Sequence, residues 1–225
     1  MNWAEMYLSK IAKAGSLNEY LQKKEGRSGG SLIRHIRQKF KPGSRILEVG
    51  TGTGAIGALL TKYGFDVVSI DNNQEMIDIA KKFFGIFNRS DNVVLVDAKD
   101  VIDKFGENSF DCVVSHGMLE HYSDNEILKF LRFQLAVAPI VIFVVPTGSM
   151  SADYRARGFG DERYLPTRYW VKLIKQDFAI KDIFGFGFKE TNLPSCLEIL
   201  FKNYTMTKLL APLCGINEFW IARRI

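Results

Sequence analysis

The stretch RILEVGTGTGAIG, residues 45–57, decides how the rest of the sequence is interpreted. A short apolar run leads into glycines that alternate with threonines, and a helical pattern follows. Glycine permits positive φ and brings backbone N–H groups close to a ligand, so such a turn between a strand and a helix is a cradle for an anion or a nucleotide. Glu48 stands two residues before the first glycine, where its charge would repel a pyrophosphate and attract an ammonium group. The stretch therefore favours a zwitterionic ligand.

Outward from this loop, short β-rich runs alternate with helical patterns. The runs span residues 45–49, 66–70, 92–96, 110–114 and 140–145, with later ones at 178–188 and 217–225. The helical patterns span residues 55–63, 74–84 and 125–137, with a further helix expected around 195–211. Apolar runs separated by helices predict a parallel sheet that is buried on both faces, extended at one edge by the two late runs. Ligands of such sheets bind at the carboxyl ends of the strands.

The first 43 residues carry helical patterns at 3–14 and 31–40 with no strand between them, and Ser28 or Ser31 can cap the second helix. We therefore predict an N-terminal helical cap, residues 1–43, ahead of a main domain, residues 44–225. The segment 147–170 joins the fifth strand to a helix that starts near Pro166, and loops of this length are usually functional. Lid insertions are accordingly expected near residues 147–165 and 190–212.

Composition narrows the class of protein. Hydrophobic residues make up 47% of the 225 residues, which is ample for a buried core. Cys112, Cys196 and Cys214 are far apart and odd in number, so they predict neither a disulfide framework nor a zinc or iron–sulfur pattern. No apolar run approaches the ~18 residues of a membrane span, and the N-terminus lacks a signal-peptide pattern. The sequence predicts a cytoplasmic protein with no membrane segment.

Two motifs point to one ligand. Glu48, Gly50, Gly52 and Gly54 match the pattern [DE]xGxGxG in full, and Asp71 follows the second β-rich run, 19 residues after Gly52. A nucleoside with a methionine tail fits both, because its ribose suits Asp71 and its amino-acid end suits the loop. The sequence here resembles the class I S-adenosylmethionine-dependent methyltransferases, in their small-molecule, type-11-like branch. The resemblance covers about residues 45–145 and implies a Rossmann-like, doubly wound, mostly parallel seven-stranded sheet.

The resemblance also implies the cofactor-binding residues. The glycine loop with Glu48 would hold the methionine end of S-adenosyl-L-methionine, Asp71 the ribose hydroxyls, and the acid after the third strand the adenine amino group. The matching positions are Glu48, Gly50, Gly52, Gly54, Asp71, Asn72, Met76, Asp97, Ala98, Ser115 and His116.

Four of these positions have alternative interpretations. Glu48 could support the fold by bonding nearby backbone N–H groups, and Asp71 could cap the helix over 73–84. Asp97 could cap the turn that follows it. Met76 is the kind of residue found more often in a core than against a cofactor.

For the reaction, the resemblance implies in-line SN2 transfer to a small-molecule acceptor. Orientation and desolvation supply most of the rate, and a base is needed only for a nucleophile that holds its proton tightly. His116, Glu120 and His121 follow the fourth strand and are the catalytic candidates, although the Glu120–His121 pair is also common for local structure. No metal-ligand set is recognisable, so we expect metal independence.

The acceptor is expected between the carboxyl end of the sheet and a lid made of residues 1–30, 150–165 and 190–212. Five residues of the lid could face an anionic or aromatic acceptor: Tyr154, Arg155, Arg157, Arg163 and Tyr164. Alternatively, Asp161 and Glu162 pair with these arginines on the surface.

Other functions remain open. The net charge of +5 keeps an RNA substrate as a less favoured alternative, beside a protein substrate, although a basic solvated surface explains the charge well. A nicotinamide-dependent oxidoreductase shares the glycine loop, but the YxxxK pattern at Tyr204–Lys208 lies late in the chain and not after a core strand. DNA and amino-group methyltransferases carry [DNS]PP[YFW] where this chain has SHGM, residues 115–118. A noncatalytic cofactor-binding module is the last alternative, and the oligomeric state stays open.

Overall fold

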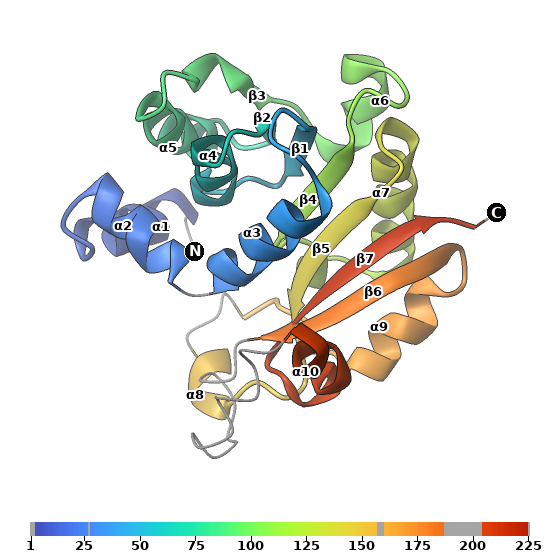
Figure 1. The fold of residues 1–225 in the computed structure, drawn as a ribbon. Coiled ribbons are helices and arrows are strands. Elements are labelled where there is room, and N and C mark those ends of the chain that lie inside the picture. The colour runs from blue at the N-terminus through green and yellow to red at the C-terminus, as the bar shows by residue number, and fades with distance from the viewer. Residues whose placement is uncertain (1–2, 27, 157–159, 187–203, 225) are drawn as a thin grey trace. The chain divides into compact units, whose positions relative to one another are not determined.

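A computed structural model describes residues 3–26, 28–156, 160–186 and 204–224. Seven strands form one sheet in the order β3-β2-β1-β4-β5-β7-β6 (Figure 1). The strands are β1 Arg45–Val49, β2 Asp66–Asp71, β3 Val93–Leu95, β4 Cys112–His116, β5 Val141–Pro146, β6 Phe178–Phe186 and β7 Ile216–Arg223. This order confirms the predicted Rossmann-like, mostly parallel sheet, with the two late strands at one edge. The chain divides into two compact units, which are described separately below.

The first unit comprises residues 1–114 and 136–138. Its strands are parallel: β1 pairs with β2 and with β4, and β2 pairs with β3. The register sets Glu48 of β1 beside Ser69 of β2 and Val114 of β4. Residues 112–114 of β4 therefore lie beside β1, the strand that leads into the glycine loop.

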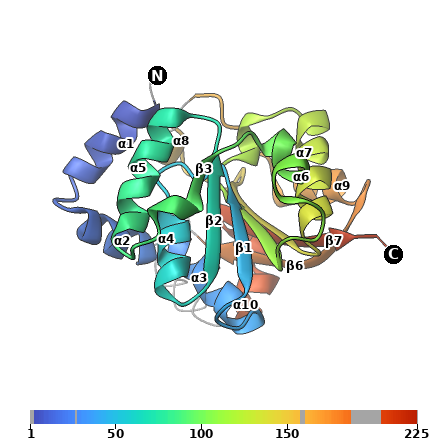
Figure 2. The ribbon, with the colours of Figure 1, turned by 90° about the horizontal axis from the view of Figure 1, so that it is seen from above.

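Helices cover one side of these strands. Helices α4 (Ala55–Lys62) and α5 (Gln74–Gly85) pack on β2, and α5 also packs on β3 (Figure 2). Their apolar faces are buried, with Leu59, Phe83 and Phe84 at most 1% exposed. Short turns η1 (Ser90–Asn92) and η2 (Ala98–Asp100) and helix α6 (Val101–Phe105) complete the unit.

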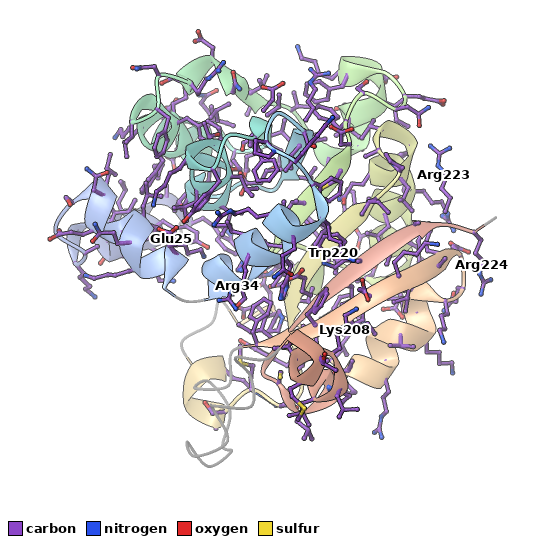
Figure 3. All side chains as sticks on the ribbon, viewed as in Figure 1. Glu25, Arg34, Lys208, Trp220, Arg223 and Arg224 are labelled. Atoms are coloured by element: carbon purple, nitrogen blue, oxygen red, sulfur yellow. The ribbon has the colours of Figure 1, made fainter. Side chains whose placement is uncertain are left out.

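The N-terminal region holds three helices where the sequence patterns predicted two. They are α1 (Trp3–Ala12), α2 (Leu17–Glu25) and α3 (Ser28–Lys39). Helix α2 is mostly polar, so hydrophobic periodicity gives little sign of it; it begins where the Ser16 hydroxyl accepts the Glu19 N–H at 3.2 Å. Glu25 of α2 accepts a hydrogen bond from Lys62 at 3.0 Å, which ties α2 to the end of α4 (Figure 3).

The second unit comprises residues 115–135 and 139–225. Strand β7 runs antiparallel to both β5 and β6. The helices are α7 (Asp124–Val137), α8 (Ala152–Arg155), α9 (Thr167–Ile174) and α10 (Tyr204–Leu209), with turns η3 (Leu119–His121) and η6 (Ala211–Leu213).

The core of the second unit is aromatic. Phe143 of β5 stacks on Phe219 of β7 with ring centroids 5.0 Å apart, and Trp170 of α9 packs against both rings. Lys208 of α10 pairs with Asp182 of β6, so this helix is fastened to the edge strand (Figure 3). Of the helix expected around 195–211, only the final part, α10, falls among the described residues.

Candidate functional site

The glycine loop connects β1 to α4 in the first unit. Gly52 and Gly54 have φ of +53° and +76°, in the left-handed region that side chains rarely adopt. A Cβ on Gly54 would also lie 2.7 Å from Cβ of Ala80, so helix α5 approaches the loop too closely for any side chain there. Two properties of glycine, its backbone freedom and its lack of a side chain, are thus both used at the start of α4.

Asp71 ends β2 directly beside this loop. Its Oδ2 accepts the backbone N–H of Gly52 at 3.0 Å, and its Oδ1 accepts the N–H of Asn73 at 3.1 Å. Burial raises the pKa of the carboxyl, and hydrogen bonds from backbone N–H groups oppose that rise. The carboxylate is therefore held in place at the glycine loop, where the sequence pattern predicted a ribose-binding acid.

The helix that follows Asp71 is capped by a different residue. The Asn73 side chain accepts the N–H groups of Glu75 at 2.9 Å and Met76 at 3.2 Å. Capping by Asp71, the alternative that the sequence allowed, is therefore not what the structure has. Asn72 is exposed beside it, whereas Met76 is buried, with its Cε 3.9 Å from where a Cβ on Gly52 would lie. Met76 thus packs beneath the loop.

Glu48 is a buried acid, only 2% exposed. Its Oε2 accepts the hydroxyls of Thr51 and Ser69, each at 2.6 Å. Burial raises its pKa, while the two hydroxyls and the Gly57 N–H lower it. This geometry favours support of the loop by Glu48, the alternative that the sequence analysis left open. The sequence did not identify Thr51 and Ser69 as its partners, because Ser69 lies on a neighbouring strand.

Asp97 follows β3 and precedes η2. It accepts the N–H of Lys99 at 3.0 Å, so it caps the turn whose first residue is Ala98. This hydrogen bond uses Oδ1 of Asp97 as its acceptor. An adenine contact by Asp97 and Ala98 stays a prediction.

In the second unit, the chain leaves β4 through Ser115, His116 and Gly117. Ser115 is buried, and its Oγ has no hydrogen-bond partner among the described residues. His116 is partly buried at the end of the strand. The Gly117 N–H donates to the Val144 carbonyl at 2.9 Å, which fixes the segment against β5.

Glu120 and His121 lie in η3, just beyond this point, and differ in their surroundings. Glu120 is 4% exposed, and its Oε2 has no hydrogen-bond partner in the described part of the chain. Burial, with smaller contributions from Glu162 and Asp161, raises its pKa to about 8. His121 contacts Asp161 through Nδ1 at 3.0 Å.

Two of the three arginines expected to face an acceptor, Arg155 and Arg163, bond to residues of their own unit. Arg163 donates from its backbone N–H to the Glu120 carbonyl at 2.9 Å, and from its guanidinium to the Tyr122 carbonyl and Asp124, each at 2.7 Å. Arg155 donates to the Met150 and Gly148 carbonyls. The hydrogen bonds of these two guanidinium groups thus go to partners other than Asp161 and Glu162 in the part of the chain that the structure describes.

The structure describes less of the other residues expected in the lid, Tyr154, Arg157 and Tyr164. The Tyr164 ring lies 5.3 Å from the Arg155 guanidinium and is partly buried. Arg157 lies outside the described residues, as do the Tyr154 side chain and most of the segment 190–212. A lid role for these residues stays a prediction.

Neither a metal-binding group nor a membrane-spanning helix is found in the described residues. Within them, no three His, Cys, Asp or Glu side chains are grouped so as to hold a metal ion. In the same ranges, no helix has both the length and the apolar character needed to cross a membrane.

Comparison with known proteins finds a family match for the central part of the chain. Residues 46–137 match the model of a family described as a methyltransferase domain. Sterol 24-C-methyltransferase erg6 of Schizosaccharomyces pombe (strain 972 / ATCC 24843) is 29% identical over 130 residues, which are 55% of this chain and 34% of that protein. The chain therefore matches about a third of the length of this curated relative.

Solved structures extend the likeness to nearly the whole chain. The magnesium protoporphyrin IX methyltransferase ChlM from Synechocystis PCC 6803, solved with bound SAM, superposes with a TM-score of 0.61 at 13% identity, covering 92% of this chain and 81% of that one. A SAM-dependent methyltransferase from Archaeoglobus fulgidus gives 0.60 at 18% identity, covering 91% and 99%. At sequence identities of 13% and 18%, these superpositions show a shared fold alone.

Proposed function

We propose that the chain, whose residues 46–137 match a methyltransferase domain, transfers a methyl group from S-adenosylmethionine to a small-molecule acceptor. The observation that carries the proposal is the Asp71 carboxylate, held 3.0 Å from the Gly52 N–H at the glycine loop. A fixed acid beside left-handed glycines suits a ligand with ribose hydroxyls and a flexible amino-acid end.

The cofactor end of the site is proposed as follows. Asp71 accepts hydrogen bonds from the ribose hydroxyls, and the backbone N–H groups of the loop face the methionine carboxylate. Glu48 stabilises the conformation of the loop by accepting hydrogen bonds from the hydroxyls of Thr51 and Ser69. Asn72, Met76, Asp97 and Ala98 flank the adenosine.

A small molecule is proposed as the acceptor. The curated relative is named for a sterol, and ChlM for a porphyrin, both of which are small molecules. The chain has no [DNS]PP[YFW] motif after β4, where it reads SHGM. An RNA or a protein substrate is the alternative, and the net charge of +5 is the observation that keeps RNA in view.

The proposed reaction is an in-line displacement without a metal ion. S-adenosylmethionine supplies an electrophilic methyl group on its sulfonium. The protein aligns the acceptor behind this group and excludes water, which together supply most of the rate. In this proposal the acceptor is bordered by residues that follow β4, namely His116, Glu120 and His121, and β4 is the strand whose residues 112–114 pair with β1.

Titration calorimetry tests the proposal directly. The purified chain should bind S-adenosylmethionine and S-adenosylhomocysteine but not NADH. If NADH binds and neither S-adenosylmethionine nor S-adenosylhomocysteine does, the proposed function is wrong and an oxidoreductase is favoured.

Metal independence is tested by chelation. S-adenosylhomocysteine affinity and any methyl transfer should survive exhaustive treatment with EDTA. Loss of transfer that magnesium or zinc restores would show that a metal takes part.

Binding to bulk RNA separates the two acceptor classes. Nonspecific phosphate contacts weaken steeply with salt, so a basic surface alone gives binding that disappears as salt is raised. RNA binding that stays tight at high salt would favour the RNA alternative.

A further inference from the structure

We propose that Glu120 is the group that takes the proton from the acceptor, and hence that the acceptor is methylated on an atom that carries a proton, a hydroxyl oxygen or an amine nitrogen. This inference rests on the proposed function. It selects Glu120 from the three catalytic candidates that follow β4, and it specifies which kind of atom on the acceptor is methylated.

Glu120 differs in its hydrogen bonds from Glu48, another buried glutamate of the chain. Glu48 and Glu120 are 2% and 4% exposed, so both carboxyls are removed from water. Oε2 of Glu48 accepts two hydroxyls, whereas Oε2 of Glu120 has no partner in the described residues of the chain. A buried polar atom without a partner destabilises a protein, so its retention calls for a ligand that bonds to it.

Glu120 lies under the turn that leaves β4: its Oε1 is 3.5 Å from where a Cβ on Gly117 would be. In the same turn, Ser115 Oγ is likewise buried and unpartnered among the residues described. Two polar atoms without partners thus occur within six residues, in the segment that borders the acceptor in the proposed reaction.

The charged side chains that act on Glu120 are acids. The segment packed against η3 brings Asp161 and Glu162, both of which oppose ionisation of Glu120. Arg163 reaches Glu120 only through its backbone N–H, because its guanidinium bonds Tyr122 and Asp124. Strand β5, which also packs on η3, carries no titratable side chain.

The two histidines of this segment differ in their positions. His121 is directed to Asp161 through Nδ1 and is therefore positioned by that acid. His116 lies at the end of β4. A carboxylate that is desolvated and faces acids is a strong base once it is ionised.

The proton and electron balance is simple. The nucleophilic atom of the acceptor forms a bond to the methyl carbon, the carbon–sulfur bond breaks, and its electron pair stays on sulfur. The proton of the acceptor moves to Oε2 of the ionised Glu120, which later releases it to water. No oxidant, reductant or metal is required.

Carbodiimide labelling tests the state and accessibility of Glu120 without a known acceptor. Diisopropylcarbodiimide reacts with protonated carboxylic acids, and mass spectrometry locates the adduct. We expect labelling of Glu120 at pH 7 that fades as the pH passes about 8. Glu48, equally buried but hydrogen-bonded, is the internal control and should stay unlabelled. An unlabelled Glu120 overturns the proposal, because an acceptor would have to reach the same oxygen.

Transfer of labelled methyl from S-adenosylmethionine to a panel of small phenols and primary amines tests the chemistry. Glu120→Gln keeps the shape of the side chain and should slow transfer ~10²-fold or more, with unchanged S-adenosylhomocysteine affinity. Glu162→Gln should move the rising limb of the pH–rate profile to lower pH. His121→Asn distinguishes the two candidate bases, because the rising limb should persist in it if Glu120 is the base. Glu126→Gln, at an exposed position on α7, is the matched control and should keep both the rate and the limb.

The outcomes separate the two proposals. If wild-type protein fails to bind S-adenosylhomocysteine, the proposed function fails. If it binds but Glu120→Gln transfers methyl at the wild-type rate, or the pH limb follows His121 instead, the role of Glu120 is wrong and the proposed function stands.

Discussion

Asp71 Oδ2 accepts the backbone N–H of Gly52 at 3.0 Å, across 19 residues of sequence. The end of β2 therefore holds the middle of the glycine loop, and the same carboxylate accepts the N–H of Asn73 through its other oxygen. One acid thus links the loop, the strand and the start of α5 before any ligand arrives, which lowers the ordering cost of binding.

Asp71→Ala tests this link. Loss of a charge-assisted hydrogen-bond partner should weaken S-adenosylhomocysteine binding by about 1.5–3 kcal/mol in titration calorimetry. Asp78→Ala, a change at an exposed position on α5, is the control and should leave affinity unchanged. Equal affinity of wild-type protein and Asp71→Ala would mean that the ribose acid lies elsewhere.

Gly57→Ala tests the packing around Glu48. A Cβ at residue 57 would lie 2.5 Å from both Glu48 Oε2 and Ser69 Oγ, so the buried acid has to move. We expect a loss of about 1–3 kcal/mol in the free energy of unfolding, measured by urea denaturation. Gly26→Ala, where the nearest atom is 3.4 Å away and the backbone is right-handed, should cost far less. Similar losses in both variants would argue against a tightly packed Glu48.

The burial of Glu120 predicts how stability depends on pH. The folded-state pKa is raised from 4.5 to about 8, so between these values the folded protein holds a proton that the unfolded chain has lost. The free energy of unfolding should therefore fall as the pH rises through this window. Glu120→Gln has no carboxyl group that can hold this proton. The free energy of unfolding of the variant minus that of wild type should therefore rise by on the order of 1–4 kcal/mol between pH 5 and pH 8.

Thermal unfolding of both proteins across that range measures this difference. Parallel stability curves for wild type and Glu120→Gln would show that Glu120 has an ordinary pKa. A gap that widens toward alkaline pH, together with slower methyl transfer, would show that a stabilising change costs function.

Arg163→Ala tests whether the segment around residue 163 is anchored by hydrogen bonds. The guanidinium bonds the Tyr122 carbonyl and Asp124, each at 2.7 Å, so its loss should lower stability by about 1–2 kcal/mol. Because these are contacts within its own unit, S-adenosylhomocysteine affinity should not change. Arg168→Ala, at an exposed position on α9, should shift stability by less than about 0.5 kcal/mol. An acceptor that binds more weakly to Arg163→Ala at unchanged stability would restore the predicted lid role.

The sequence by itself determined the elements of the sheet and the glycine loop. Period-two and period-3.6 patterns are local, and positive φ at Gly52 and Gly54 follows from residue type, so both can be predicted without tertiary information. The polar helix α2 shows where this fails, because it has too few apolar residues to reveal its period.

Only the tertiary structure decided which partner each polar side chain takes. Glu48 meets Ser69 because β1 and β2 pair in register, and Arg163 meets Asp124, 39 residues away, and not the acids beside it in the chain. Strand β7 likewise lies between β5 and β6, although it is the last strand in sequence. Residue type limits what a polar group can bond, but long-range packing selects the bond, because each buried donor and acceptor takes whichever partner the fold brings within about 3 Å.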